Sequence, residues 1–337
     1  MKQVKAFGPG DLRVVDVEIP QPRADQVQIR VRASGICGSD KWYWYVKEPT
    51  ESIAGHEIAG EVTQVGEAVT ALKVGDRVIV NNVGGCGHCP ACLEGAFVLC
   101  EKWDGSGDIN HGYSEYVVAT ARNCQKLDER ISFVEGALLM DNWGTPYGGL
   151  SHVDAHPGDV IVVFGLGPIG QAAVALAATR GARIVAVDPV AFRRDFAKKL
   201  GAALTLEPGA RAATEIVRFA DGIGAHAVIE CSSQAQSYET GLRALRVGGT
   251  LVTIGEHAEY LLKPSDALLR RSLRIQGSWY STLRQGEELQ RMTVDGRIRP
   301  KAILTHEIQG LDELPRMFPD IIACRDGLIK AVIVMED

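Results

Sequence analysis

The most reactive side chains in this chain are cysteines, and four of them gather in one short segment. The chain has eight cysteines, and four stand at Cys86, Cys89, Cys92 and Cys100. Disulfide-built proteins are usually short and secreted, whereas this chain has 337 residues and its start lacks the long apolar core of a signal peptide. Clustered thiols in such a chain therefore indicate metal ligands.

The spacing of these cysteines, Cys-x2-Cys-x2-Cys-x7-Cys, predicts a structural zinc site. Four thiolates complete a tetrahedral shell and leave no position for a substrate. An iron–sulfur cluster is the alternative, but the chain offers no second cysteine cluster. A zinc-ribbon binding module is a further alternative, and it would normally lie beside a basic or aromatic surface that this segment does not supply.

A glycine-rich turn between an apolar run at residues 160–164 and a helical pattern predicts a dinucleotide site. The first glycine permits a tight turn, the second lets a pyrophosphate approach the backbone, and the third allows the helix to pack closely on the strand. The helix N-terminus adds a favourable potential for phosphate. The motif consists of Gly165, Leu166, Gly167, Pro168, Ile169 and Gly170.

Asp188 ends the next apolar run and predicts NAD rather than NADP. Its carboxylate can accept hydrogen bonds from both adenosine ribose hydroxyls, and it would repel a 2′-phosphate. At contact distance this repulsion is on the order of a few kcal/mol for an effective dielectric constant of about 20. Arg193, on the following helical pattern, is a candidate for bracing the same ribose, although an exposed arginine on a helix is often only a solvated charge.

The elements that must position these residues change character near the middle of the chain. Residues 1–150 contain short alternating segments, at 27–32, 58–65 and 76–80, that predict a mostly β domain. Residues 151–287 alternate apolar runs with helical patterns, which predicts a doubly wound parallel sheet and an α/β fold. A final apolar run at 327–334 predicts a strand that returns to the first domain.

The segment Gly55-His56-Glu57-Ile-Ala-Gly60, continued to Gly66, resembles the zinc signature of medium-chain alcohol dehydrogenases. The four-cysteine segment and the Gly165–Asp188 unit follow in that family's order and at its intervals. The resemblance implies a GroES-like catalytic domain over 1–150, completed by 288–337, and a Rossmann domain over 151–287. It also implies a catalytic zinc in the cleft between them, so two zinc ions per chain, together with NAD.

The resemblance also implies roles for single residues. Cys37, His56 and Asp141 match the three protein ligands of the catalytic zinc, and Glu57 matches a residue that reaches the zinc in some states. Zinc with three protein ligands keeps one position for water or an alcohol, whose pKa it lowers. Thr145 matches a residue that packs on the nicotinamide, and Ser39 matches the hydroxyl that receives the alcohol proton.

One position departs from the family pattern. The family often has a histidine three residues after Ser39 as the outer end of a proton relay, but this chain has Trp42 there. Tryptophan donates a hydrogen bond and cannot accept a proton, so the relay must end elsewhere. Trp42, Tyr113 and Trp143 are candidates for lining an amphipathic substrate pocket, because aromatic rings with polar tips suit polyhydroxy substrates.

These patterns together predict a zinc-dependent oxidation of a secondary alcohol, such as a polyol or a cyclic sugar alcohol, with NAD. The alternatives are a carbonyl reductase that works mainly in the reverse direction and a non-catalytic nucleotide-binding relative. The net charge of −6 disfavours nucleic acid and anionic membranes as partners, and no run of eighteen apolar residues is present. We expect a cytoplasmic homo-oligomer, a dimer or a tetramer, that acts on a small molecule.

Overall fold

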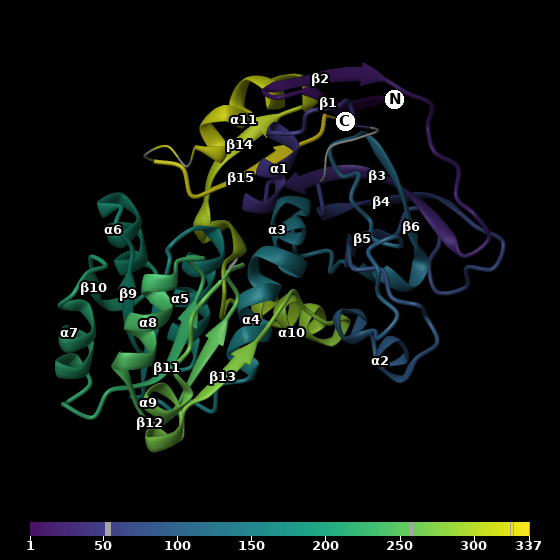
Figure 1. Cartoon of the computed structure of the whole chain (residues 1–337). Coiled ribbons are helices and arrows are strands. Elements are labelled where there is room, and N and C mark those ends of the chain that lie inside the picture. The colour runs from purple at the N-terminus through teal and green to yellow at the C-terminus, as the bar shows by residue number, and fades with distance from the viewer. Residues whose placement is uncertain (51–54, 257–258, 324, 326, 337) are drawn as a thin grey trace. The chain divides into compact units, whose positions relative to one another are not determined.

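The computed structural model describes residues 1–50, 55–256, 259–323, 325 and 327–336, and its internal contacts divide the chain into two compact units (Figure 1). One unit combines Met1–Gly144 with Ser281–Asp337, and the other is Thr145–Tyr280. The domain boundaries expected from the sequence, at residues 150/151 and 287/288, stay predictions. Among the described residues, no helix is both long and apolar enough to cross a bilayer.

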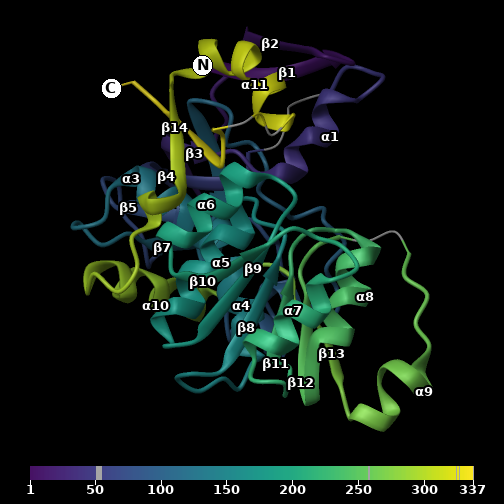
Figure 2. The same ribbon diagram turned by 90° about the vertical axis from the view of Figure 1, so that its left-hand side faces the viewer.

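The second unit is built on a six-stranded parallel sheet, as the alternating pattern predicts. The first strand along the chain lies in the middle, and the strand order reverses beside it, as in dinucleotide-binding folds. In spatial order the strands are β10 (Ala202–Leu206), β9 (Arg183–Val187), β8 (Val160–Phe164), β11 (Ala225–Glu230), β12 (Leu245–Thr253) and β13 (Arg274–Gly277) (Figures 1 and 2).

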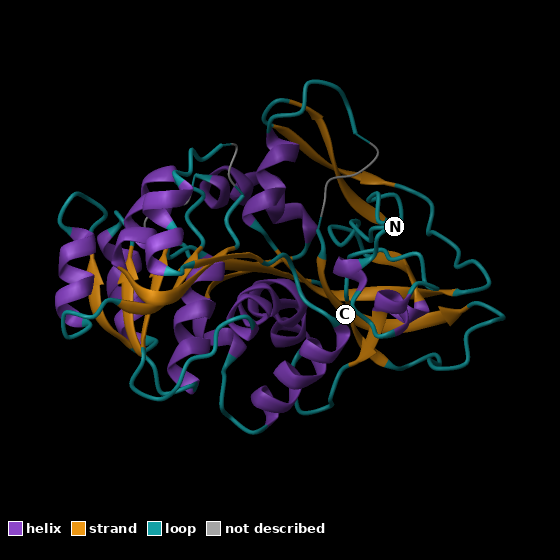
Figure 3. Ribbon diagram, turned by 60° about the horizontal axis from the view of Figure 1, so that its bottom comes forward, coloured by secondary structure: helices purple, strands orange, loops and turns teal. Residues whose placement is uncertain are grey.

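Helices connect these strands and cover both faces of the sheet (Figure 3). Every residue of β8 is buried, which explains why that strand reads as an unbroken apolar run. The connecting helical elements are α5 (Pro168–Thr179), α6 (Ala191–Lys199), α7 (Ala212–Phe219), α8 (Ala235–Ala244), α9 (Pro264–Ala267) and the 3₁₀ turn η5 (Leu269–Arg271).

The first unit contains a seven-stranded mixed sheet and a separate hairpin, and it confirms the predicted mostly β character. The C-terminal strand returns to this sheet as predicted, because it pairs antiparallel with β3. The main path of the sheet runs β14 (Leu304–Gln309), β15 (Lys330–Val334), β3 (Gln26–Gly35), β4 (Glu57–Val65), β5 (Arg77–Val80) and β7 (Cys124–Lys126), with β6 (Tyr116–Thr120) paired to β3. The hairpin is β1 (Lys2–Gly8) and β2 (Asp11–Asp16).

Short helical elements link the strands of the first unit, and several of them carry candidate site residues. The α-helices are α1 (Lys41–Trp44), α2 (Pro90–Leu93), α3 (Phe133–Leu138), α10 (Leu283–Val294) and α11 (Leu314–Ile322). Helix α4 (Gly144–Ser151) starts at the last residue before the division and otherwise belongs to the second unit. The 3₁₀ helices are η1 (Gly38–Asp40), η2 (Phe97–Leu99), η3 (Ala121–Asn123), η6 (Pro300–Ile303) and η7 (Leu311–Glu313). The element η4 (Leu139–Trp143) is a π-helix.

The glycine motif gives a test of the packing between α5 and β8. A Cβ atom at Gly170 would lie 1.8 Å from the carbonyl oxygen of Gly165, whereas one at Gly167 would meet no protein atom within 4 Å. We expect Gly170→Ala to lower the free energy of unfolding by at least about 2 kcal/mol, because the helix must move away from the turn. Gly167→Ala is the matched control and should cost under about 1 kcal/mol. Urea titration of both variants measures the difference, and equal stability would contradict it.

Candidate functional site

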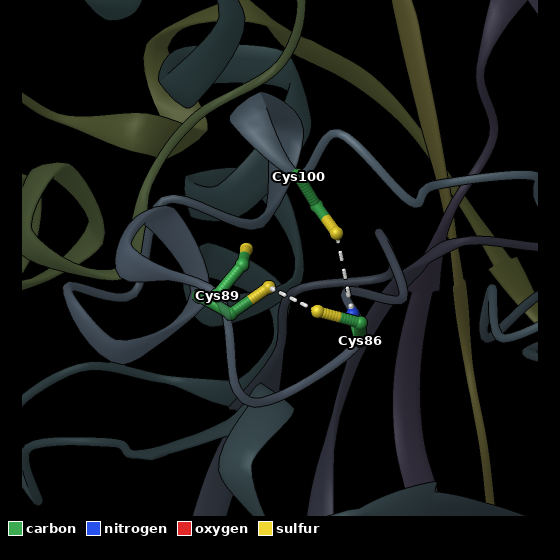
Figure 4. A group of neighbouring side chains, drawn as sticks. Cys86, Cys89 and Cys100 are labelled. Carbon is green, nitrogen blue, oxygen red and sulfur yellow. Dashed lines mark hydrogen bonds between the residues drawn. The ribbon is translucent and has the colours of Figure 1, made fainter.

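The first candidate metal site lies in the loop that contains α2. Cys89 caps α2, Cys92 lies within it, and Cys86 and Cys100 flank it in sequence. The four sulfur atoms all lie within 4.8 Å of one another, and Figure 4 shows Cys86, Cys89 and Cys100 directed toward one another. The structure thus brings together all four cysteines of the predicted structural zinc site.

The surroundings of these thiols fit a metal that needs thiolates. The backbone N–H of His88 lowers the pKa of Cys86 to about 6, whereas burial raises that of Cys92 to about 12. A bound cation favours the thiolate at every position and releases the protons. His88 is turned away from ligation, because its Nδ1 lies 2.8 Å from the carbonyl oxygen of Cys86.

A second group of donors forms where β3 ends and β4 begins. Gly35 of β3 pairs with Glu57 of β4, and this register places Cys37 beside His56. Asp141 comes from the π-helical turn η4, a kind of helix irregularity that is frequent at functional sites. Donor atoms of Cys37, His56, Glu57 and Asp141 all lie within 4.8 Å of one another. One thiol, one imidazole and two carboxylates are donors that zinc accepts.

His56 contacts a carboxylate with each ring nitrogen. Its Nε2 lies 2.9 Å from Oδ2 of Asp141, and its Nδ1 lies 3.6 Å from Oδ1 of Asp40. Burial opposes the charged imidazolium, but these carboxylates outweigh it and raise the pKa of His56 well above its ordinary value. With a metal at Nε2, the carboxylate of Asp40 is placed to orient the ring from the other side.

Asp40 is a site residue that the sequence reasoning missed. It is buried, and its Oδ2 accepts hydrogen bonds from the backbone N–H of Cys37 at 2.8 Å and from the hydroxyl of Tyr113. A metal-binding histidine commonly has a carboxylate behind it, so an aspartate three residues after Cys37 was the available signal. The pairing partner could not be found from sequence, because Tyr113 lies 73 residues away.

Lys330 is the second missed residue. It is 1% exposed, on β15, and its Nζ donates to Oε1 of Glu57 at 2.5 Å and to the carbonyl oxygen of Ile36 at 2.8 Å. Burial raises the pKa of Glu57 to about 7 with Lys330 opposing the shift, and Glu57 helps to raise that of Lys330. A single lysine inside the apolar run at residues 327–334 was the sequence signal.

The remaining predicted residues of this unit have different environments. Ser39 is exposed in η1, and Trp42 is 64% exposed on α1, where its ring lies 5.9 Å from the ammonium of Lys41. Tyr113 and Trp143 are fully buried, and the hydroxyl of Tyr113 is already bonded to Asp40. The substrate-pocket role of Trp42, Tyr113 and Trp143 stays a prediction.

The second unit contains a cavity of about 420 Å³ at the carboxyl ends of its strands. Gly165, Gly167, Asp188 and Arg193 line it, so four residues predicted for cofactor binding meet in one place. The helix α5 begins next to it, with Pro168 at its first position, followed by Ile169. Thr145 is buried in α4.

Asp188 is 3% exposed, and both of its oxygens already accept backbone hydrogen bonds. The N–H of Leu166 donates to Oδ2 at 2.7 Å, and the N–H of Val190 donates to Oδ1 at 2.8 Å. Arg193 Nη1 lies 3.8 Å from Oδ2. Because each carboxylate oxygen can accept more than one hydrogen bond, the group is fixed in position and still able to receive ribose hydroxyls.

Comparison with known families covers most of both units. Residues 23–129 match the alcohol dehydrogenase GroES-like domain, and residues 168–294 match the zinc-binding dehydrogenase family. An alcohol dehydrogenase of Moraxella sp. (strain TAE123) is 34% identical over 332 residues, which cover 96% of each chain. A probable D-xylulose reductase A of Emericella nidulans is 35% identical over 323 residues, which cover 91% of this chain and 89% of the relative.

Solved structures with the same fold include three dehydrogenases. Alcohol dehydrogenase TADH from Thermus sp. ATN1 has a TM-score of 0.90 at 26% identity, with all of both chains covered. The 2R,3R-butanediol dehydrogenase of Bacillus subtilis has a TM-score of 0.86 at 25% identity, with 99% of both chains covered. A putative zinc-binding dehydrogenase of Sinorhizobium meliloti 1021, bound to NADP, has a TM-score of 0.85 at 26% identity and covers 99% and 98%.

The two donor sets lead to a prediction about metal content. We expect about two zinc equivalents per chain, one in the closed four-cysteine set and one that exchanges faster in the Cys37 set. Cys37→Ser should lower the content to about one equivalent and leave the melting temperature nearly unchanged. Cys89→Ser is the matched substitution in the four-cysteine site, and it should lower both the zinc content and the melting temperature. Elemental analysis and thermal melts measure both, and an active preparation with one zinc or none would contradict the assignment.

Proposed function

Starting from a chain that belongs to the zinc-type medium-chain alcohol dehydrogenase family, we propose that it transfers hydride from a secondary alcohol to NAD⁺ and yields a ketone. Oxidoreduction of an alcohol follows from membership of the family. The observation that supports the proposal best is the complete donor set of Cys37, His56 and Asp141. A non-catalytic relative would have no need to keep these three ligands together in a buried position.

The ligand set assigns a task to each of the surrounding side chains. Zinc, when bound by Cys37, His56 and Asp141, would act as a Lewis acid toward the alcohol oxygen. Asp40 orients His56 and is itself fixed by Tyr113 and the backbone of Cys37. The imidazole therefore needs little rearrangement when the ligand set is completed, which favours binding.

Ser39 is the proposed acceptor of the alcohol proton. Its side chain is exposed, two residues from the proposed metal ligand Cys37. A hydroxyl group can accept one hydrogen bond while it donates another, so it can pass a proton on when a further acceptor is present. Since Trp42 cannot be that acceptor, the proton leaves through water or through the cofactor ribose.

NAD is the proposed cofactor, and Asp188 supports it. The carboxylate is fixed by two backbone N–H groups in a cavity that the glycine motif also lines. NAD, when bound there, would accept the hydride at its nicotinamide ring. Gly167 leaves open space where a pyrophosphate approaches, and Arg193 beside Asp188 is placed to brace the adenosine ribose.

A polyol is the proposed class of substrate. The support is the similarity to probable D-xylulose reductases, which at 35% identity are about as similar to this chain as the alcohol dehydrogenase of Moraxella at 34%. We further propose a homo-oligomer that acts on small molecules and binds neither nucleic acid nor membranes. Strand β13 supports the oligomer, because within the described part of the chain it pairs only with β12, and such edges are templates for pairing. Light scattering would measure the assembly.

Cofactor choice tests the nucleotide half of the proposal. With a panel of polyols and simple secondary alcohols, the unmodified protein should use NAD at least roughly tenfold better than NADP, which about 1.4 kcal/mol of repulsion supplies. Asp188→Ala should weaken NAD use and reduce the discrimination. Asp195→Ala removes a carboxylate on α6, the helix that follows Asp188, outside the cavity; it is the control and should change neither property. Equal use of both cofactors by the unmodified protein would contradict the NAD assignment.

Proton transfer tests the catalytic half. Ser39→Ala should lower the oxidation rate by about a hundredfold or more at neutral pH, in the range typical of general acid–base groups. Trp42→Phe should keep most of the turnover, because this exposed ring cannot accept the proton. Trp42→His should speed oxidation at lower pH by adding an outer acceptor. Rate–pH profiles measure the effect of all three substitutions under conditions where the chemical step limits the rate. An unchanged oxidation rate in Ser39→Ala would mean that Ser39 is only a turn residue.

A further inference from the structure

Lys330 joins the two strand ends that carry the first two metal ligands. Its ammonium contacts the carbonyl oxygen of Ile36, which precedes Cys37, and a carboxylate oxygen of Glu57, which follows His56. Lysine and glutamate are both almost inaccessible, with side chains 1% and 0% exposed. Such a pair costs more to bury than two apolar side chains of similar size, so its presence beside a metal site calls for a functional explanation.

Glu57 is close enough to the other donors to become a ligand. One of its carboxylate oxygens belongs to the set of donor atoms that lie within 4.8 Å of one another. Its Oε2 has no hydrogen-bond partner among the described residues, while Oε1 is held by Lys330. The carboxylate also packs against Gly35, where a Cβ atom would be 1.9 Å from Oε2.

A count of charges shows which arrangement is favoured. The thiolate of Cys37 and the carboxylate of Asp141 balance the two positive charges of a zinc ion, and the ammonium of Lys330 balances Glu57. If Glu57 bound the metal instead, the metal set would carry a net negative charge. The metal would then draw negative charge from the carboxylate of Glu57. The buried ammonium of Lys330, which otherwise donates to the neutral carbonyl oxygen of Ile36, would lose much of the charge that compensates it, and a poorly compensated buried charge is unfavourable.

We propose that Lys330 is a positioning residue that withholds Glu57 from the catalytic metal and thereby keeps one coordination position available to the alcohol. The inference rests on the proposed zinc site. It concerns the number of protein ligands on the metal, a property that can be measured without turnover.

Cobalt provides the test, because its visible spectrum reports the number and type of its ligands. The metal of the Cys37 set is removed from the full-length protein by mild chelation and replaced by Co²⁺. We expect Lys330→Met to change the spectrum, because Glu57 loses its counter-ion and becomes a fourth protein ligand. In the zinc-loaded variant, release of the exchangeable zinc to a chelator should slow by at least roughly tenfold, which corresponds to about 1.4 kcal/mol in the barrier.

Two further variants separate this effect from a loss of stability. Lys330→Met combined with Glu57→Gln replaces the pair by neutral side chains of similar size and should restore the spectrum and the release rate of the unmodified protein. Glu57→Gln alone should also match the unmodified protein, because the carboxylate is not a ligand there. The closed four-cysteine site is an internal control, and its zinc should be released at the same rate in every variant.

Three results would overturn the inference: an unchanged spectrum and release rate in Lys330→Met, the same change in the double variant, or an altered spectrum in Glu57→Gln alone. The last variant retains a hydrogen-bond acceptor for Lys330, so it keeps the inference testable if Lys330→Met does not fold. Failure of the zinc site that the proposed function requires is distinguishable, because the unmodified protein would then bind no cobalt at Cys37.

Discussion

The antiparallel pairing of β3 with β4 is the constraint on which the candidate catalytic site depends. Pairing of Gly35 with Glu57 sets the distance between Cys37 and His56, which lie in loops just beyond the paired residues. A shift of one residue would turn the side chains of β4 to the opposite face. The register also requires glycine at position 35, because Glu57 occupies the space that a side chain there would need. Cys37, His56 and Glu57 are thus placed by the backbone hydrogen bonds between β3 and β4 rather than by loop conformation alone.

The site residues that could be predicted are those with a local motif. The four cysteines, the glycine turn and the segment from Gly55 to Gly66 each show their chemistry within a few residues, so sequence reasoning found them. The fold class followed for the same reason, since the alternation of buried strands and helices repeats along the second unit. Fully buried strands such as β8 have a pattern that does not depend on a distant partner.

The residues that were missed are those whose role depends on a distant partner. Lys330 is separated from Glu57 by 273 residues, and the pairing of β3 with both β15 and β4 brings the two together. Tyr113 was predicted for its ring, but the structure uses its hydroxyl to hold Asp40. Long-range pairs of this kind follow from the order of the strands in the sheet. The local sequence around either residue does not reveal that order.

Buried carboxylates are stabilised in different ways in the two units. Asp188 is one carboxylate, and two backbone N–H groups donate to it while the guanidinium of Arg193 lies 3.8 Å away. The metal site instead combines Cys37, His56, Asp141 and Glu57. Asp40 contacts His56 from the other side, and the buried ammonium of Lys330 contacts Glu57. Several acidic groups at such short distances repel one another, so a bound cation should stabilise the local arrangement of these side chains. The apolar interior of the surrounding sheet supplies the stability that the site itself lacks, with Ile29, Val31, Ile58 and Val62 of β3 and β4 all buried. The ends of β3 and β4 therefore position the metal donors, while the buried residues along both strands stabilise the fold. A substitution of a metal ligand can then change the chemistry of the site and leave the sheet intact.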